Sequence, residues 1–299
     1  MRQYLMHSQV SRAIEETTPT TSLRLGAGVE VDVTLLQNYH TLINGITGSG
    51  KSNSAVVIAE ELLKAKVRLL IFDTDKGEYT PLKDFFPYIK IIKNSSQTDI
   101  IENLTDGGIP HIIDMSGWSG RAERLDYMVE VLEPLYENLK QRKEAGEPIP
   151  VVIFLEEASV LIPARHKGYG TARTSQQKIN QIIEEIARRG RSRGATLIIL
   201  DQRPSGLQYD PISQCRNRFL FKVTDDSDID RYGRLLGGIS KNKAAERLER
   251  LPPYHAFYKD TEVAGYRIVR FRRKRIRDIA SNIQWKPAEV AEEETKNEA

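Results

Sequence analysis

Five short apolar runs recur along the first two thirds of the chain, and a polar or glycine-containing segment follows each one. They span residues 40–45, 67–73, 109–114, 151–157 and 195–201. Their apolar positions are nearly continuous, whereas a strand with one face in water alternates apolar and polar residues. The pattern therefore predicts strands that are buried on both faces. A sixth strand is predicted at 218–223.

Segments with helical periodicity separate these runs. Apolar residues recur every three or four positions within 51–66, 121–145 and 174–189, which is typical of helices that bury one face. An alternation of buried strands and amphipathic helices predicts an α/β fold with a mostly parallel central sheet flanked by helices. Ligands bind at the carboxyl ends of the strands in such folds.

Small β elaborations are predicted at both ends of this pattern. The stretch LRLGAGVEVDV, at 23–33, indicates a strand pair around Gly26 and Gly28, and 255–271 indicates a hairpin with its turn at Gly265. From Trp285 onward the composition is typical of a disordered tail. The residues from Lys286 to Ala299 carry a charge of −3 out of a total of +3, so the body carries about +6.

Composition excludes several classes of protein. The single cysteine, Cys215, excludes an intramolecular disulfide framework and a thiolate zinc cluster, and we interpret it as a core residue. No apolar run reaches the roughly 18 residues of a membrane helix, and the start turns polar before a signal peptide could form. We therefore expect a cytoplasmic protein without membrane insertion. The mildly basic body is compatible with a nucleic-acid partner.

Residues 45–52 read GITGSGKS and fit the pattern G-x-x-x-x-G-K-[ST], between a predicted strand and a predicted helix. In this motif the glycines let backbone N–H groups face phosphates, the lysine reaches the β- and γ-phosphates, and the final hydroxyl ligates Mg²⁺. The sequence therefore predicts a site for ATP and Mg²⁺. We expect eight residues to contribute: Gly45, Thr47, Gly48, Ser49, Gly50, Lys51, Ser52 and Asn53.

The motif makes a RecA-like P-loop NTPase the predicted fold class. We divide the chain into an N-terminal strand-and-loop elaboration at 1–38, a RecA-like ATPase domain at 39–280 and an acidic disordered tail at 281–299.

Two adjacent acids close the run VVIFLEE. Glu156 is our candidate for the acid that holds Mg²⁺ from a neighbouring strand. Glu157 follows it and points to the other side of the strand, and it is our candidate for the base that orients and deprotonates the attacking water. The competing interpretation is a solvated acid pair at the start of a helix.

The next strand ends in Asp201 and Gln202, and Gln202 is the candidate sensor of the γ-phosphate. A plain polar turn before Pro204 is the alternative. Upstream, 186–194 places four arginines within six positions. One of them could act as an arginine finger across a subunit interface, or all of them could simply satisfy the end of a helix.

At this point the chain resembles the HerA/FtsK superfamily of motor ATPases, and the HerA-like branch most. The resemblance spans about residues 40–235, in order, through NYHTLINGITGSGKSNS, FDTDKGEYTPL, VVIFLEEAS, IARRGRSRGATLIILDQRPSGL and CRNRFLFKVTDDSDIDRY. It implies a homo-oligomeric ring, a hexamer in the family, that moves double-stranded DNA and hydrolyses ATP at subunit interfaces.

Carried over by position, the resemblance agrees with the roles proposed for Lys51, Ser52, Glu156, Glu157 and Gln202. It also implies a trans-acting arginine in 186–194, where Arg188 matches best and Arg191 next. The GEY at 77–79 matches too, after a loop one residue longer than the family pattern.

This sequence departs from the family pattern in three respects. Only 44 residues precede the phosphate loop, too few for the β-barrel of HerA helicases, which puts nuclease docking in doubt. Asp201 stands where the family has a small or hydroxylated residue. The C-terminal segment shows no winged helix that would read DNA sequence.

Two basic segments are candidates for DNA contact. Residues 164–173 combine cations with glycines after the acid pair and predict a loop that binds DNA phosphates, or else an ordinary solvated loop. The run at 270–277 predicts a strand with cations on one face. That face could bind phosphate or an acidic neighbouring subunit, or could protect a sheet edge from aggregation.

The sequence thus favours an ATP-hydrolysing ring motor that translocates double-stranded DNA. A viral or plasmid DNA-packaging or DNA-transfer ATPase is the nearest alternative, and a capsid or transfer protein would then replace a nuclease as partner. An ATP-dependent assembly switch that moves no DNA is the alternative from another class.

Overall fold

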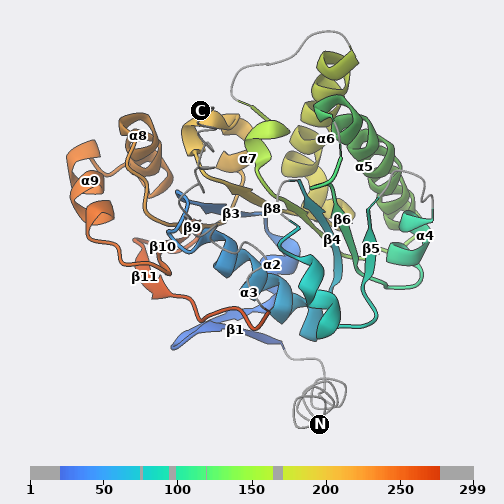
Figure 1. The fold of residues 1–299 in the computed structure, drawn as a ribbon, viewed down its shortest axis with the longest axis horizontal. Helices are drawn as coiled ribbons and strands as arrows, with labels where there is room; N and C mark the ends of the chain where they lie inside the picture. The colour runs from blue at the N-terminus through green and yellow to red at the C-terminus, as the bar shows by residue number, and fades with distance from the viewer. Residues whose placement is uncertain (1–20, 75–76, 94–98, 119, 164–170, 277–299) are drawn as a thin grey trace, which may run out of the picture.

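The structure, a computed structural model, describes residues 21–74, 77–93, 99–118, 120–163 and 171–276. Within these residues one large sheet has the strand order β11-β10-β9-β3-β8-β7-β4-β6-β5. The pairs from β9 to β5 are all parallel, whereas β10 pairs antiparallel with β9 and β11. This confirms the predicted α/β class with a mostly parallel sheet (Figure 1).

The strands predicted from the apolar runs and from the two hairpins all form. The parallel strands are β3 (Thr41–Asn44), β4 (Arg68–Asp73), β5 (Lys90–Ile92), β6 (His111–Asp114), β7 (Val151–Leu155), β8 (Ala195–Asp201) and β9 (Asn217–Leu220). The C-terminal hairpin is β10 (His255–Asp260) with β11 (Arg267–Arg270), and the N-terminal hairpin is β1 (Ser22–Gly26) with β2 (Val29–Asp32). Only β5, three residues long, lies outside the predicted runs.

The three predicted helices also form, and eight shorter helical elements accompany them in the described part of the chain. The long helices are α3 (Lys51–Lys64), α5 (Arg121–Glu144) and α6 (Thr171–Arg193). The short α-helices are α2 (Val33–Asn38), α4 (Ile100–Thr105), α7 (Tyr209–Ser213), α8 (Asp226–Leu235) and α9 (Lys241–Glu249), and single 3-10 turns are η1 (Thr80–Asp84), η2 (Ala158–Val160) and η3 (Pro204–Gly206).

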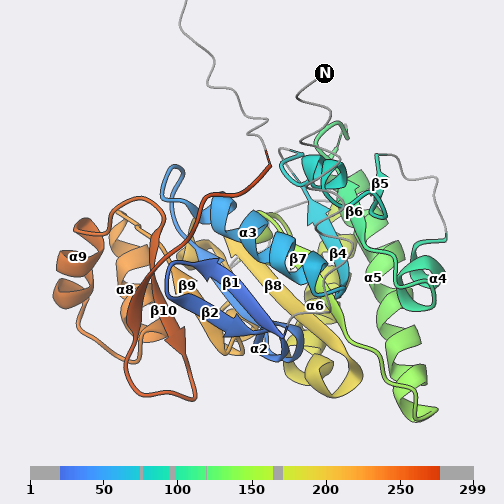
Figure 2. The same ribbon diagram turned by 90° about the horizontal axis from the view of Figure 1, so that it is seen from below.

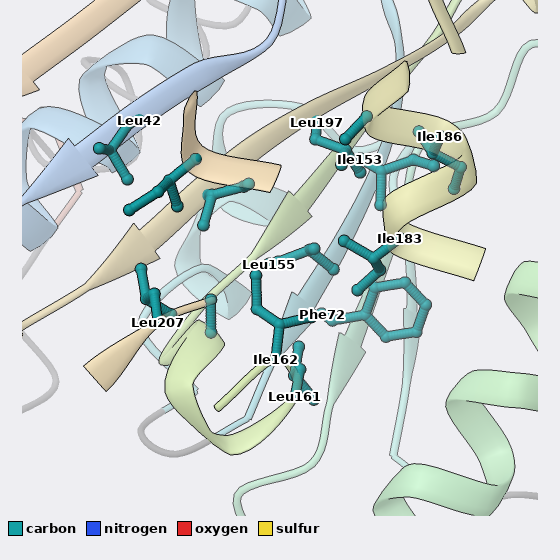
Figure 3. Packing of buried hydrophobic residues seen from close by; sticks show 14 of the residues in the cluster. Leu42, Phe72, Ile153, Leu155, Leu161, Ile162, Ile183, Ile186, Leu197 and Leu207 are labelled. Carbon is teal, nitrogen blue, oxygen red and sulfur yellow. The ribbon is translucent and has the colours of Figure 1, made fainter. Parts of the chain in front are cut away.

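Both faces of the sheet are buried, which explains the continuous apolar runs. In β7, Ile153 and Leu155 face the core that α5 and α6 cover, together with Leu197 of β8. Figure 3 shows this packing against Ile183 of α6. Phe154 and its neighbours on alternate positions face the opposite core, which α3 and the N-terminal hairpin cover. Strand alternation thus distributes the apolar residues to two cores.

The N-terminal hairpin lies against α3 and next to the segment after β11 (Figure 2). Arg272 N donates to Leu25 O at 2.8 Å. Gly26 is needed at this crossing, because a Cβ there would lie 1.9 Å from Arg270 O. The two ends of the described chain therefore meet on the helix that begins at the phosphate loop.

The structure corrects the expectation for the basic run at 270–277. The strand β11 ends at Arg270, so the cations that follow do not share a strand face. Arg272 instead pairs with acids of its own chain, at 2.7 Å from Glu60 and 2.8 Å from Glu61 on α3. Arg277 lies outside the described residues.

Cys215 is fully buried, as expected of a core residue. Among the described residues, no helix combines the length and apolar character needed to cross a bilayer.

Candidate active site

The phosphate loop connects β3 to α3 at the carboxyl edge of the sheet. Backbone hydrogen bonds anchor its start to both neighbouring strands, from Gly45 N to Asp201 O at 3.2 Å and from Ile46 N to Lys222 O at 3.0 Å. Its last glycine, Gly50, has a φ of 104°. A Cβ at Gly50 would lie 2.8 Å from the Cα of Tyr254. The loop therefore needs glycine there both for its backbone conformation and for this close approach.

A cleft of about 720 Å³ opens over the loop and the start of α3. Most of the predicted phosphate-binding residues line it. The lining residues are Ile46, Thr47, Gly48, Gly50, Lys51, Ser52, Asn53, Glu78, Gln202, Tyr254, Arg273, Lys274 and Ile276. Gly45 and Ser49 belong to the loop but are buried. The Ser49 hydroxyl donates a hydrogen bond to Ile46 O at 2.7 Å.

One continuous chain of contacts joins the residues predicted to carry out catalysis. Lys51 Nζ lies 3.6 Å from Glu157 Oε1, and both side chains are largely buried. Gln202 Nε2 donates to the same carboxylate oxygen at 2.7 Å. The Thr47 hydroxyl donates to Gln202 Oε1 at 3.1 Å. The structure thus brings the candidate base, the candidate sensor and the loop lysine together from three different parts of the chain.

Glu157 has an unusual backbone. Its φ of 46° and ψ of 51° lie in the left-handed region, which non-glycine residues rarely adopt. The strand β7 has already ended at Leu155, so strand alternation does not separate Glu157 from Glu156 as we expected. The left-handed turn separates them instead. Strained backbone of this kind is concentrated at functional sites.

Asp201 fixes the two loops that carry Glu157 and Gln202. Its carboxylate accepts a hydrogen bond from Ser159 N at 2.6 Å and another from Arg203 N at 2.8 Å. Burial raises the pKa of Asp201, while these N–H groups act in the opposite direction. The unusual acid before Gln202 therefore binds backbone, and does not line the cleft.

Glu156 is almost completely buried beside the loop. Burial raises its pKa well above the usual range; the negative charges of Asp73, Glu78 and Glu157 add to this, and Lys51 opposes it. Its Oε2 atom is buried without a hydrogen-bond partner. A carboxylate in this position is costly for the fold unless a cation or its water shell compensates it.

Mg²⁺ is the group that this arrangement fits. Glu78 contributes a second buried carboxylate oxygen without a partner, and it lines the cleft with Ser52. No cluster of three or more His, Cys, Asp or Glu in the described part of the chain could hold a metal alone. Mg²⁺ keeps several waters and takes its other ligands from phosphates and one or two protein oxygens.

Asp73, at the end of β4, organises the GEY segment. Its carboxylate accepts hydrogen bonds from Gly77 N at 3.1 Å and Tyr79 N at 3.2 Å. These bonds place Glu78 in the cleft, while Tyr79 packs edge-on against Phe154 in the core. Sequence matching found this segment without assigning it a role.

The predicted arginines lie away from their own cleft. Arg191 stacks on Tyr39, 4.2 Å from the ring centre, and Tyr39 precedes β3. The end of α6 is therefore at the amino edge of the sheet, opposite the phosphate loop. Arg188 is exposed and pairs with the exposed Asp210 at 3.3 Å. Neither arginine lines the cleft of this chain, and their catalytic role stays a prediction.

Beyond Ile46 and Glu78, four further cleft residues were not among the predicted site residues: Tyr254, Arg273, Lys274 and Ile276. Arg273, Lys274 and Ile276 lie within the basic run 270–277, which we interpreted as a strand, whereas no signal in the sequence indicated Tyr254. Asn53 lines the cleft, and its side-chain amide also binds the backbone of this run on both sides. Asn53 Nδ2 donates to Arg272 O at 2.7 Å and Asn53 Oδ1 accepts from Lys274 N at 2.9 Å.

The predicted DNA-binding loop at 164–173 lies mostly outside the described residues. Only its last part is described, as the first turn of α6, where Arg173 is exposed.

A family model and several related sequences both show that this chain is similar to HerA helicases. A family model for the central domain of the helicase HerA matches residues 22–100. The DNA double-strand break repair helicase HerA of Sulfurisphaera tokodaii is 28% identical over 152 residues, and that of Sulfolobus acidocaldarius is 32% identical over 102 residues. These alignments cover 49% and 34% of this chain, but only 28% and 19% of the relatives.

Solved structures share the fold at low identity. The genome-packaging NTPase B204 of Sulfolobus turreted icosahedral virus 2, in complex with ATP-γ-S, has a TM-score of 0.53 at 17% identity, covering 78% of this chain and 97% of that one. The conjugation coupling protein TcpA of pCW3 has a TM-score of 0.55 at 17% identity, covering 87% and 67%. The chain is thus similar in sequence to HerA helicases over part of its length, and it shares the fold of these P-loop ATPases.

Proposed function

We propose that this protein hydrolyses ATP in the cleft over residues 45–52 and uses the energy to translocate double-stranded DNA as a ring. The observation that carries the proposal is the contact chain from Lys51 through Glu157 to Gln202 and Thr47. A nucleotide switch without hydrolysis has no need for a buried carboxylate held by both the loop lysine and a sensor amide.

The proposed reaction follows from these contacts. The oxygen of a water molecule attacks the γ-phosphorus, the bond to the β–γ bridging oxygen breaks, and ADP and phosphate leave. Glu157 accepts the proton of that water, and Gln202 orients the carboxylate through its 2.7 Å hydrogen bond. Lys51 faces Glu157 at 3.6 Å and moves its charge to the phosphates when they bind.

Ser52 and Glu156 would hold Mg²⁺, with Glu78 as a further oxygen beside them. When bound there, Mg²⁺ would supply positive charge that offsets the charge developing on the phosphates. Glu156 is suited to this role because its buried Oε2 has no partner in the protein.

The DNA part of the proposal rests on the relatives, which are named as DNA double-strand break repair helicases. The ring part agrees with the position of Arg188. This arginine is exposed on α6, remote from its own cleft, and its ion pair with Asp210 joins two exposed side chains. Exposed pairs of this type contribute about 0–1 kcal/mol, so a neighbouring subunit could recruit Arg188 at little cost.

The ATPase rate, measured with and without linear duplex DNA at several salt concentrations, tests the proposal. We expect DNA to stimulate the wild-type rate and the stimulation to fade as salt rises, because phosphate contacts release counterions. Both Glu157→Gln and Arg188→Ala should lose the DNA-stimulated ATPase activity. A rate indifferent to DNA, with Arg188→Ala unchanged, would support the assembly switch instead.

A further inference from the structure

The cleft has two ends, and the sheet order separates them. Gln202 and Glu157 follow β8 and β7, on one side of the strand that feeds the phosphate loop. Tyr254 directly precedes β10, on the other side of that strand. If hydrolysis occurs beside Glu157, the terminal phosphate occupies the first end. The nucleoside must then extend along the loop toward the second end.

Tyr254 is held in an unusual conformation at this second end. Its φ of 66° is left-handed, and it is one of three non-glycine residues with positive φ in the described chain. Tyr254 N donates to Ser49 O in the loop, and Tyr254 O accepts from Phe271 N, each at 2.9 Å. The backbone of Tyr254 thus bonds to the phosphate loop on one side and to the segment after β11 on the other.

That segment, residues 271–276, is called the strap below. Asn53 of α3 bonds the strap backbone at Arg272 and Lys274, and Glu60 Oε1 accepts from Arg275 N at 2.7 Å. Because three side-chain hydrogen bonds from α3 fix its backbone, the strap is built onto the helix that carries Lys51 and Ser52. The red segment after β11 follows this course beside β1 and α3 in Figures 1 and 2.

The strap places three side chains at the second end of the cleft. The Arg273 guanidinium lies over the Tyr254 ring, 3.9 Å from its centre, and also donates to the Tyr254 hydroxyl. Ile276 is buried and lines the same cleft, as does Lys274. A planar cation on an aromatic ring, next to an aliphatic side chain, is a surface on which a flat heteroaromatic ring stacks well.

We propose that Tyr254, Arg273 and Ile276 form the subsite for the base of the bound nucleotide, and that the strap is its fixed wall. The inference rests on the proposed function only in placing the terminal phosphate beside Glu157. The same cations could instead bind phosphate, which would make this end of the cleft a second phosphate clamp. A base subsite and a phosphate clamp differ in one respect: only with a base subsite does the affinity for a ligand depend on its base.

Binding of two probes separates them: Mg²⁺–ADP, and inorganic tripolyphosphate with Mg²⁺, both by calorimetry. We expect Tyr254→Ala and Arg273→Ala to raise the Kd of ADP about tenfold, the scale of one stacking or cation–π contact. Their Kd for tripolyphosphate should stay within about twofold of wild type. Tyr254→Phe keeps the ring and should keep ADP binding.

Arg270→Ala is the matched control, because Arg270 is exposed, belongs to the same basic run and lies outside the cleft. Lys51→Ala should weaken both probes. Equal weakening of both probes in Arg273→Ala, with Tyr254→Phe behaving as wild type, would replace the base subsite by a phosphate clamp. Unchanged ADP binding in Tyr254→Ala would also overturn the inference. Because neither probe is hydrolysed and no DNA is present, these results are independent of the motor hypothesis.

Discussion

At the scale of single residues, two glutamates of the candidate site lower the free energy of unfolding. Glu157 adopts a left-handed backbone, and Glu156 keeps a buried carboxylate oxygen without a partner. Backbone strain of this kind costs about 1–3 kcal/mol. Both features lie where we expect the nucleotide chemistry. Their cost in folding free energy is offset by packing elsewhere in the molecule.

Glu156 provides a direct test, because it should lower the stability of the fold while it supports ATP hydrolysis. A raised folded-state pKa means that ionisation of Glu156 opposes folding, increasingly as pH rises above the ordinary carboxyl pKa. We expect Glu156→Gln, without nucleotide or Mg²⁺ at neutral pH, to raise the Tm by about 2–4 °C. The same variant should lose most Mg²⁺-dependent ATPase activity.

Thermal unfolding with and without Mg²⁺–ATP checks both parts. Mg²⁺–ATP should stabilise wild type more than the variant, since ligand stabilisation follows affinity. A lower Tm for ligand-free Glu156→Gln would contradict the account of a costly carboxylate.

At the scale of elements, the loops after β7 and β8 act as one unit because Asp201 bonds to both. Its carboxylate accepts from Ser159 N in η2 and from Arg203 N after β8. Buried N–H groups left without a partner cost about 1–3 kcal/mol each. The position of Glu157 relative to Gln202 therefore depends on a residue that does not line the cleft.

We expect Asp201→Ala to lower kcat about 10- to 100-fold, because a displacement of about 1 Å at catalytic groups has effects of this size. Lys51 and the loop remain intact, so KM for ATP should change by less than about threefold. Steady-state kinetics measure both constants. Asp201→Asn, which retains one acceptor oxygen, should be affected less, and equal losses in the two variants would argue for a role of the charge itself.

Most elements could be predicted from the sequence because buried strands and amphipathic helices have distinct periodicities. The run 174–189 was predicted as a helix, and α6 extends it at both ends to Thr171–Arg193. The short β5, α2 and α4 were missed, since three to six residues show no reliable period. The strand predicted from the cations after Arg270 was wrong, because the acids of α3 that bind them are more than 200 residues away in the chain.

The candidate site was predicted only where local sequence determines it. The phosphate loop, Glu156, Glu157 and Gln202 were found because a glycine pattern and strand ends mark them. Tyr254 was not found, since its position depends on the pairing of β10 with β9 and on a contact with Ser49. Contacts between distant segments leave no pattern in a single sequence.

At the scale of the whole molecule, the chain presents its cleft and its α6 arginines at opposite edges of the sheet. Such a subunit can complete a neighbour's site only by a head-to-tail contact, which closes into a ring when the rotation permits. The account therefore requires that Arg188 act on a cleft that belongs to another copy.

Mixing two inactive variants tests this requirement. Arg188→Ala has an intact Glu157, and Glu157→Gln supplies an intact Arg188. If they assemble randomly at equal amounts, about a quarter of the interfaces are complete, and we expect ATPase activity to reappear at about that fraction of wild type. Arg250→Ala, which removes an arginine from an exposed pair on α9, should stay active alone. No recovery in the mixture would place Arg188 outside catalysis in trans.

The central claim is that Glu157 takes the proton of the attacking water, and the nucleotide retained by Glu157→Gln tests it most directly. After incubation with Mg²⁺–ATP and removal of free nucleotide, bound nucleotide is extracted and separated by chromatography. The account predicts intact ATP on Glu157→Gln and ADP on wild type, with Lys51→Ala retaining little of either. ADP on Glu157→Gln, with turnover near the wild-type rate, would contradict the assignment of the catalytic base.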